Sequence, residues 1–457
     1  MINPPTTHMR KFLLTVAAAL PASAIAAQAP AVRLINAPEA SSPHVFGAVG
    51  AIRQLPGGKV LVNDVAKRQL TLLDPALGSA IIVADSVSGT ANSYGVRPGG
   101  LIAYVGDSTL FVDPAGLSMF VIDPAGKIAR VASVPRSQDA MALGSNLLGT
   151  PGLDAKGRLV YRGGFGRVIA GPAAVQGGRA GGGSGDAAAR AASLAGMFEQ
   201  PDTTALVRVD LATRKLDTAA FFKIPKNKMN VQQNDRGMSV TTEINPLQTV
   251  DDWAVLADGS IALIRGQDYH VDFIRADGSM SSSPKIAYDW QRLTDEDKVA
   301  IIDSAKAAFE RARAAAPNGN TVIGGPGGGG PPGGGGMVVM NFSTRTGDGA
   351  GGGGIRTGEA GGPQMSFVSA NELPDYRPVF AQGSSRGDAD GNLWVRTSAT
   401  RAGSVGGPIY DVIGSKGELI DRVQIPSGRQ IVGFGKGGVV YMMARDDSGA
   451  WLERTHR

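Results

Sequence analysis

The sequence contains no cysteine and only four histidines among its 457 residues. The absence of cysteine excludes disulfide bonds, cysteine-ligated zinc, iron–sulfur clusters and thiol nucleophiles. Four histidines leave too few ligands for a metal site built mainly from histidine. The formal net charge is only +5 and no run of Lys and Arg exceeds two residues. We therefore do not expect a groove that binds nucleic acid.

Long apolar runs are also missing, apart from a short one near the N-terminus. Arg10 and Lys11 precede the apolar stretch 12–20, and small residues follow it up to Ala26. This order is typical of a cleaved secretory signal peptide, which we place at residues 1–26. A membrane anchor is the alternative, and Pro21 argues against it. No later stretch approaches the ~20 apolar residues that span a bilayer, so we predict a periplasmic or secreted protein without a membrane span.

Glycine, in contrast, is abundant, with 65 residues. Part of it recurs in a repeat of short apolar runs separated by Asp-Gly or Gly-Gly turns. The clearest copy spans residues 253–288, with Asp-Gly turns at 258–259 and 277–278. Short β-rich runs with a repeat period of ~40–50 residues indicate a propeller. Six copies can be counted, so we predict an all-β, six-bladed β-propeller that forms one domain over residues 31–457.

The sixth copy lacks its fourth strand. The segment 31–35 (Ala-Val-Arg-Leu-Ile) has strand character but no unit of its own. We predict that this N-terminal strand pairs into the last unit and closes the ring, because closure removes exposed sheet edges. The alternative is an open sandwich with an unrelated N-terminal strand.

Two stretches carry a resemblance to a known family. Residues 256–278 contain LADGSIALIR, and residues 390–435 contain DGNLWVR, YDVI and IPSGR. Here the chain resembles six-bladed propellers of the NHL-like class, in particular exported bacterial proteins of unassigned function. The resemblance covers about residues 45–457 apart from two insertions. It implies the fold and no specific activity.

Two glycine-rich insertions interrupt the repeat, at about 163–204 and about 289–375. The first falls inside the third unit and the second between blades four and five. In up-and-down blades both positions lie on one face, called the insertion-bearing face below. Thr294 and the acidic residues after it predict a helix that ends near Ala316 and packs on the propeller. We expect the rest to be partly disordered, as a mobile rim over the channel or as a variable linker.

A charged residue ends the second strand of each unit, on this same face. Four arginines and a nearby tyrosine form our predicted ligand-binding set: Arg162, Arg265, Arg396, Arg445 and Tyr269. Guanidinium groups bind carboxylates and phosphates in a two-pronged geometry, which favours a carboxylate, a phosphate or a sulfated sugar as ligand. The alternative is that these arginines form ion pairs between blades.

The first two units carry Asn63, Asp64 and Asp113 at the equivalent positions. Other six-bladed propellers include calcium-dependent lactonases and lyases, so the resemblance offers these residues as candidate calcium ligands. The alternative is structural, because Asp after a strand commonly accepts hydrogen bonds from turn N–H groups. His270 is a candidate general base, although a lone histidine is more often structural.

Residues 383–387 fit the G-x-S-x-G pattern of serine hydrolases, but they precede a strand rather than a helix, so we do not expect a serine nucleophile there.

Taken together, these patterns predict an exported, monomeric binding protein of the cell envelope. Its partner would be an anionic small molecule, a saccharide or a protein, with no cofactor. The competing hypotheses are a calcium-assisted hydrolase or lyase and a purely structural scaffold.

Overall fold

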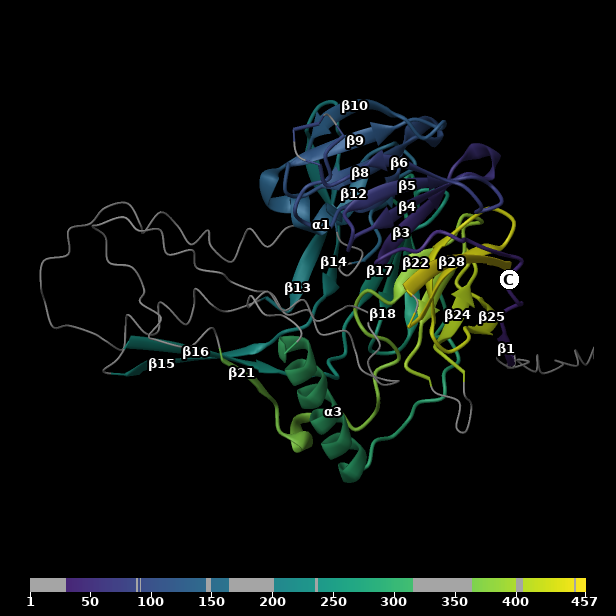
Figure 1. Ribbon diagram of the computed structural model, residues 1–457. Helices are drawn as coiled ribbons and strands as arrows, with labels where there is room; N and C mark the ends of the chain where they lie inside the picture. Colours follow the sequence, from purple (N-terminus) through teal and green to yellow (C-terminus); the bar gives the residue numbers. More distant parts are fainter. Residues whose placement is uncertain are drawn as a thin grey trace, which may run out of the picture.

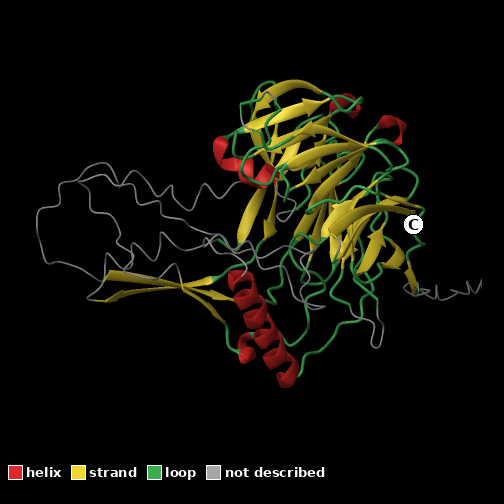
Figure 2. Ribbon diagram, in the orientation of Figure 1, coloured by secondary structure: helices red, strands yellow, loops and turns green. Residues whose placement is uncertain are grey.

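The computed structural model describes residues 30–457 except 88, 91, 145–148, 164–200, 235–236, 315–363, 400–405 and 448. The described residues form six antiparallel blades around a common centre (Figure 1, Figure 2), as predicted. The predicted signal peptide and most of the first insertion lie outside the described residues. Among the described residues, no helix is long and apolar enough to cross a membrane.

The blades follow one another along the chain, each built from strands in chain order. Blade 1 contains β3 (Val49–Gln54), β4 (Val60–Asp64), β5 (Gln69–Leu73) and β6 (Ala80–Ala84). Blade 2 contains β7 (Gly100–Ala103), β8 (Thr109–Asp113), β9 (Ser118–Ile122) and β10 (Ile128–Ser133). Blade 3 contains β11 (Gly152–Leu153), β12 (Leu159–Arg162), β13 (Thr203–Val209) and β14 (Leu216–Lys223).

The second half of the chain forms the remaining three blades. Blade 4 contains β17 (Asp252–Val255), β18 (Ile261–Arg265), β19 (His270–Ile274) and β20 (Met280–Ser282). Blade 5 contains β22 (Ser385–Gly387), β23 (Leu393–Arg396), β24 (Ile409–Ile413) and β25 (Leu419–Gln424). Blade 6 contains β26 (Arg429–Phe434), β27 (Val439–Asp446) and β28 (Gly449–His456). Short helical turns connect strands at η1 (Pro56–Gly58), η2 (Val105–Asp107), η3 (Ser137–Asp139) and α1 (Ala140–Gly144).

The middle strands are apolar on both sides because each blade lies between two others. Strands β4, β8 and β24 are buried at every residue, whereas the outer strand β6 is mostly exposed. Aromatic side chains join neighbouring blades, as in the contacts Phe222–Trp253 and Trp394–Phe434. Gly259 adopts φ 79°, and a Cβ there would lie 2.2 Å from the backbone nitrogen of Ala155 in blade 3. Tight packing between blades therefore demands glycine at this Asp-Gly turn.

The first strands of the blades lie at the centre of the ring. β26 contacts β3, β3 contacts β7, and β17 contacts β22. Because the strands alternate in direction, the start of each first strand lies beside the end of the second, as shown by the pairs Asp252–Ile264 and Ser385–Val395. The connections that carry the insertions leave at this same end. The insertion-bearing face therefore surrounds one mouth of the central channel.

The N-terminal segment reaches two blades. β2 (Ala40–Ser41) pairs with β28 and takes the outer position in blade 6. β1 (Val32–Leu34) instead pairs in parallel with β25 of blade 5. The prediction that residues 31–35 complete the last blade was therefore wrong. Arg33 fixes β1 to blade 5, with its Nη2 2.6 Å from Asp421 Oδ2.

A small appendage beside the insertion-bearing face was not foreseen (Figure 1). Hairpin β15 (Lys228–Asn234) and β16 (Gly237–Ile244) follows blade 3, and β21 (Gln364–Phe367) pairs in parallel with β16. A short turn, η4 (Ala370–Glu372), follows β21. The appendage therefore joins two connections that are far apart in the sequence.

The predicted helix belongs to this appendage. Helix α3 (Asp295–Ala314) follows Thr294, whose Oγ1 accepts a hydrogen bond from Asp297 N at 3.2 Å. This is the expected cap. Ile302 packs in a cluster whose other buried members are Leu247, Leu293, Val368 and Leu373. The apolar side of the helix therefore packs against the connecting segments of the appendage and not, as predicted, against the blades.

Replacing Phe46 tests how far the ring depends on the segment that completes blade 6. Phe46 is 2% exposed, its N–H donates to Ala450 O at 2.7 Å, and it packs in the core shared by blades 1 and 6. Phe46→Ala should lower the free energy of unfolding by about 3–5 kcal/mol in urea titrations, because it leaves a cavity. Leu34→Ala, at a side chain 59% exposed on β1, is the control and should change it by less than about 0.5 kcal/mol. Equal losses would contradict this account.

Candidate functional site at the channel mouth

The predicted arginines do lie at second-strand ends on the insertion-bearing face, but their surroundings differ. Arg162 ends β12 and is 6% exposed, and burial lowers its pKa to about 10. Arg445, near the end of β27, is exposed, and its Nη2 donates to Gly47 O at 2.5 Å. Strand position alone therefore does not decide which guanidinium is available to a ligand.

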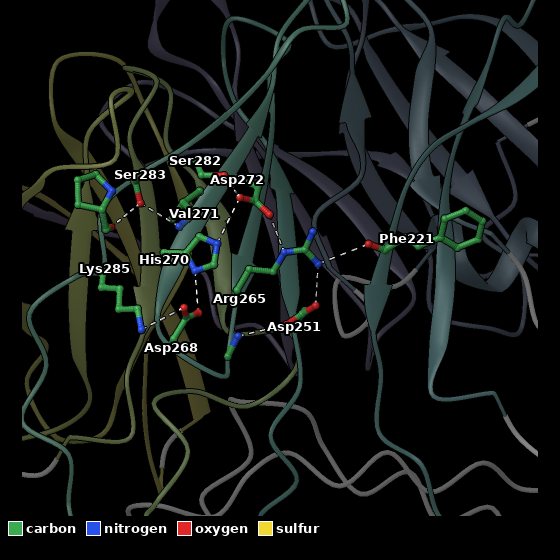
Figure 3. A network of polar contacts seen from close by, with 12 residues as sticks. Phe221, Asp251, Arg265, Asp268, His270, Val271, Asp272, Ser282, Ser283 and Lys285 are labelled. Atoms are coloured by element: carbon green, nitrogen blue, oxygen red, sulfur yellow. Dashed lines mark hydrogen bonds and ion pairs between the residues drawn. The ribbon is translucent and has the colours of Figure 1, made fainter.

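Arg265 already has two carboxylate partners (Figure 3). Its Nη1 lies 2.8 Å from Asp251 Oδ2, and its Nε lies 2.8 Å from Asp272 Oδ2. Both acids belong to blade 4, so these ion pairs lie within one blade rather than between blades. Because its charge is balanced in this way, Arg265 is a poor receptor for an anionic ligand.

His270 belongs to the same network (Figure 3). Its Nδ1 lies 2.7 Å from Asp268 Oδ1 and its Nε2 lies 3.3 Å from Asp272 Oδ1. Burial alone would raise the pKa of Asp272, but hydrogen bonds from Ser282 and Arg265 outweigh it and hold that pKa below its usual value. Both imidazole nitrogens face carboxylates, which favours the structural role for His270 over that of a general base.

Tyr269 lies in the core between blades 4 and 5. It is fully buried, and its hydroxyl donates to Asp411 Oδ2 at 2.9 Å. Burial and the charge of Asp411 both raise the pKa of this hydroxyl well above its usual value. A ligand at the channel mouth cannot reach it, which corrects its assignment to the binding set.

The three candidate calcium ligands are occupied by protein hydrogen bonds. Asn63 Nδ2 donates to Gly99 O at 2.8 Å, and its Oδ1 accepts from Tyr94 at 2.9 Å. Asp113 accepts from Ala115 N at 3.0 Å. Asp64 accepts from the backbone N–H groups of Gly47, Ala48, Ala66 and Lys67.

These hydrogen bonds give the three side chains the structural role that was the alternative to a calcium site, as acceptors for turns and between blades. Among the residues that the structure describes, no group of three or more His, Asp or Glu side chains is arranged to hold a metal ion.

A polar centre that the strand-end pattern missed lies where blades 4 and 5 meet. Asp252, the first residue of β17, is fully buried. Its Oδ2 accepts from Ser385 N at 2.9 Å and from Ser385 Oγ at 2.8 Å, while its Oδ1 has no hydrogen-bond partner. Burial raises the pKa of Asp252 to about 6, although the bonds from Ser385 act in the opposite direction.

Arg386 lies next to Ser385 on β22 and is half-buried. Among the described residues, its side chain forms no hydrogen bond or ion pair. Burial lowers the pKa of Arg386, and the positive charge of Arg396 lowers it further. Tyr410 and Asp252 act in the opposite direction and raise it. Arg386 pairs with Trp394 and Arg396 pairs with Tyr410 in the strand register. Because alternate residues share a side of a sheet, the two arginines lie on one side of blade 5.

The G-x-S-x-G match fails in the structure for the reason expected. Ser385 is 1% exposed, opens a β-strand, and its Oγ lies 2.8 Å from Asp252 Oδ2 and 3.1 Å from Trp253 O. It therefore bridges two blades rather than serving as a nucleophile. The signal that marks this centre in the sequence is an arginine in the middle of a three-residue first strand, where a buried charge needs compensation.

Comparisons with known proteins assign no function to this chain. No family model and no curated protein matches the sequence. A putative exported protein from Bacteroides fragilis is 9% identical, with 93% of this chain and 94% of that chain covered and a TM-score of 0.38. Virginiamycin B lyase from Staphylococcus aureus is 10% identical over 92% and 98%, with a TM-score of 0.34. A gluconolactonase from Xanthomonas campestris is 10% identical over 90% and 87%, with a TM-score of 0.36. Likeness at this level carries no ligand, activity or site residue to this chain.

Arg265→Gln should destabilise the protein, because it leaves the carboxylates of Asp251 and Asp272 without their cation. We expect a loss of about 2–3 kcal/mol in the free energy of unfolding at pH 7. In the wild type, Arg265 helps to keep the pKa of Asp272 low, so its contribution is present above the usual Asp pKa and is lost as pH falls through the lower folded value. The difference between variant and wild type should therefore shrink at acidic pH.

The matched control is Lys285→Gln. The Lys285 ammonium is 73% exposed and lies 3.5 Å from Asp268 Oδ2, so its loss should cost less than about 0.5 kcal/mol. Urea unfolding at several pH values measures both variants. Similar losses in the two would show that the Arg265 network adds no special stability.

Proposed function

We propose that this protein is an exported β-propeller that binds an anionic ligand at the mouth of the channel on the insertion-bearing face. The observation that carries the proposal is Arg386, a half-buried residue whose guanidinium has no described carboxylate at ion-pair distance. The positive charge of its neighbour Arg396 further disfavours the charged form of Arg386. A desolvated cation without a counter-charge is unfavourable. A bound anion removes that cost.

The chemistry of two guanidiniums defines the class of ligand. Each can donate two parallel hydrogen bonds to a carboxylate, a phosphate or a sulfate ester. Arg162, buried at the end of a second strand on the same face, adds positive charge to this end of the channel. Arg265 is left out because its carboxylate partners balance it, and Arg445 because it lies exposed against a backbone carbonyl.

The rest of the proposal is consistent with the sequence. The signal peptide predicted at residues 1–26 would place the protein in the periplasm or outside the cell, as a monomer of the NHL-like class. The described strands and helix of the appendage leave the blades around this same mouth (Figure 1). A small anion, an acidic saccharide or an acidic protein segment would each offer anionic oxygens to Arg386.

Arg386→Gln should abolish anion binding. The melting temperature of the wild type should rise with added sulfate, phosphate or malonate at constant ionic strength, because a ligand that binds only the folded state stabilises it. The variant should lose at least about tenfold in affinity, as expected when a charged hydrogen-bond donor is removed. Arg445→Gln removes the same charge from an exposed position on the same face and should keep the wild-type response.

The variant without ligand supplies a second readout. Arg386→Gln should not lower the melting temperature, because it removes a half-buried charge that has no described carboxylate at ion-pair distance. A strongly destabilised variant that still responded to anions like the wild type would show that Arg386 is structural, and it would overturn the proposal.

A further inference from the structure

The outer strand of blade 1 is an exposed apolar sheet edge. β6 lies at the end of its sheet, next to β5. Its sequence is Ala-Ile-Ile-Val-Ala, without a charged residue. Ile81 is 65% exposed and Ile82 is 51% exposed, and two more exposed apolar residues, Val87 and Val96, follow in the segment after the strand. A hydrophobic edge strand readily pairs with another chain, so proteins usually protect such edges.

The outer strands of the other blades are protected in different ways. β25 of blade 5 is covered by β1, and β2 and β20 contain only two and three residues. β10 carries Arg130, and β14 carries Asp217 and Lys223. A covering strand, a short length and a charge each discourage pairing with another chain. Among the described outer strands, β6 is the one that has none of these protections.

The backbone of β6 offers its outer edge to a further strand. Asp74 N, directly after β5, donates to Ser79 O, directly before β6, at 3.1 Å. Because hydrogen-bonded and non-hydrogen-bonded pairs alternate along an antiparallel ladder, the N–H and C=O groups of Ile81 face β5, and those of Ala80 and Ile82 face outward. Among the described residues, no strand pairs with Ala80 or Ile82 on that outer side.

Blade 5 shows that an edge of this length holds a strand. The open stretch of β6 ends at Val83, whose carbonyl accepts from Asn92 Nδ2 at 3.1 Å. The three residues 80–82 therefore remain open. β1 also has three residues, and it pairs with the outer edge of β25. Arg33 of β1 adds the ion pair to Asp421, so the molecule already contains one added strand that is held by backbone pairing and by an arginine–aspartate contact.

An aspartate lies at each end of the open edge of β6. Asp74 accepts from Gly78 N and from the N–H and hydroxyl of Ser79. Asp85, directly after the strand, accepts from Val87 N at 2.9 Å. Among the described residues, neither carboxylate forms an ion pair. A strand that paired with β6 would bring its two ends close to these carboxylates, so Lys or Arg at those ends would be favoured.

We propose that the outer edge of β6 docks an extended segment of a partner protein, which adds a fifth strand to blade 1. The segment has apolar side chains between Lys or Arg residues at its two ends. Its backbone pairs with Ala80 and Ile82, as in other complexes formed by strand addition. Its apolar side chains cover Ile81 and Ile82, and its basic ends neutralise Asp74 and Asp85. This surface is independent of the proposed anion site.

Fluorescence anisotropy with the labelled peptide Lys-Val-Thr-Ile-Thr-Val-Lys tests the docking. The wild type should bind this peptide, and it should bind a peptide with Gln at both ends about fivefold more weakly, as expected for two exposed ion pairs. A third peptide, with Pro in place of the central Ile, keeps the charges but cannot pair as a strand, and should not bind. Hydrogen exchange should show that the first peptide protects β6 and not β10.

Ile82→Pro removes the outward N–H and should weaken binding of the Lys-ended peptide at least about tenfold. An edge strand tolerates proline where its N–H faces solvent, so the fold should be retained. Val131→Pro is the matched control. Val131 is 54% exposed on β10, and because Val134 N donates to Leu117 O, the N–H of Val131 also faces outward. This variant should bind the peptide as the wild type does.

Asp85→Asn tests the charges and keeps an oxygen to accept from Val87 N. It should weaken binding of the Lys-ended peptide about two- to threefold and leave binding of the Gln-ended peptide unchanged. Asp277→Asn is its control, because Asp277 of blade 4 likewise accepts from a turn N–H, that of Ser279, at 2.8 Å. It should change neither affinity. This pair of variants decides the question if Ile82→Pro does not fold.

Two results would overturn the proposal. The first is a Lys-ended peptide that fails to bind the wild type, or that binds wild type and Ile82→Pro equally. The second is a wild-type dimer that grows with concentration in analytical ultracentrifugation and is lost in Ile82→Pro, because a second copy of this chain would then occupy the edge. Neither result bears on anion binding, which is tested separately with Arg386→Gln.

Discussion

The burial of both faces of every blade is the constraint on which the rest of the structure depends. A single four-stranded sheet with two apolar sides is unstable in water, so each blade requires a neighbour on either side and the ring has to close. This requirement sets the first strands at the centre and gathers the second-strand ends around one mouth. The buried contact between Asp252 of blade 4 and Ser385 of blade 5 is a consequence of that arrangement.

Compensation of charge distinguishes the arginines of this face. Arg265, at the end of the second strand of blade 4, has two carboxylates at 2.8 Å. Arg386, in the first strand of blade 5, has none at ion-pair distance among the described residues. The first guanidinium holds its own blade together. The second has no carboxylate partner at ion-pair distance among the described residues, and this difference is the reason why we propose it as the binding site.

The sequence predicts the blades well because their signals are local. Turn glycines, apolar runs and the cap at Thr294 depend on residues a few positions apart, and so does the turn role of Asp64. The path of the N-terminus was missed because segments 31–35 and 40–41 are both short strands, and only contacts with the far end of the chain decide where each pairs. Hairpin β15–β16 was missed because it lies outside the repeat.

The candidate site was predicted only in part, for a similar reason. The sequence places charged side chains on the correct face, but it does not show which of them find partners. Asp252 and Ser385 are 133 positions apart, so no local pattern links them. Tyr269 follows a strand end, as a ligand-binding side chain would, yet the packing of blade 4 against blade 5 encloses it.

The two short N-terminal strands also determine the order in which the protein can fold. Arg33 and its partner Asp421 are separated by 388 positions, and β2 pairs with the last strand of the chain. A chain made from its N-terminus must keep this segment unpaired until the final strands are available, and contacts so distant in sequence form slowly. A chain that ended before β28 would leave β2 without its partner strand, so the outer position of blade 6 could not form.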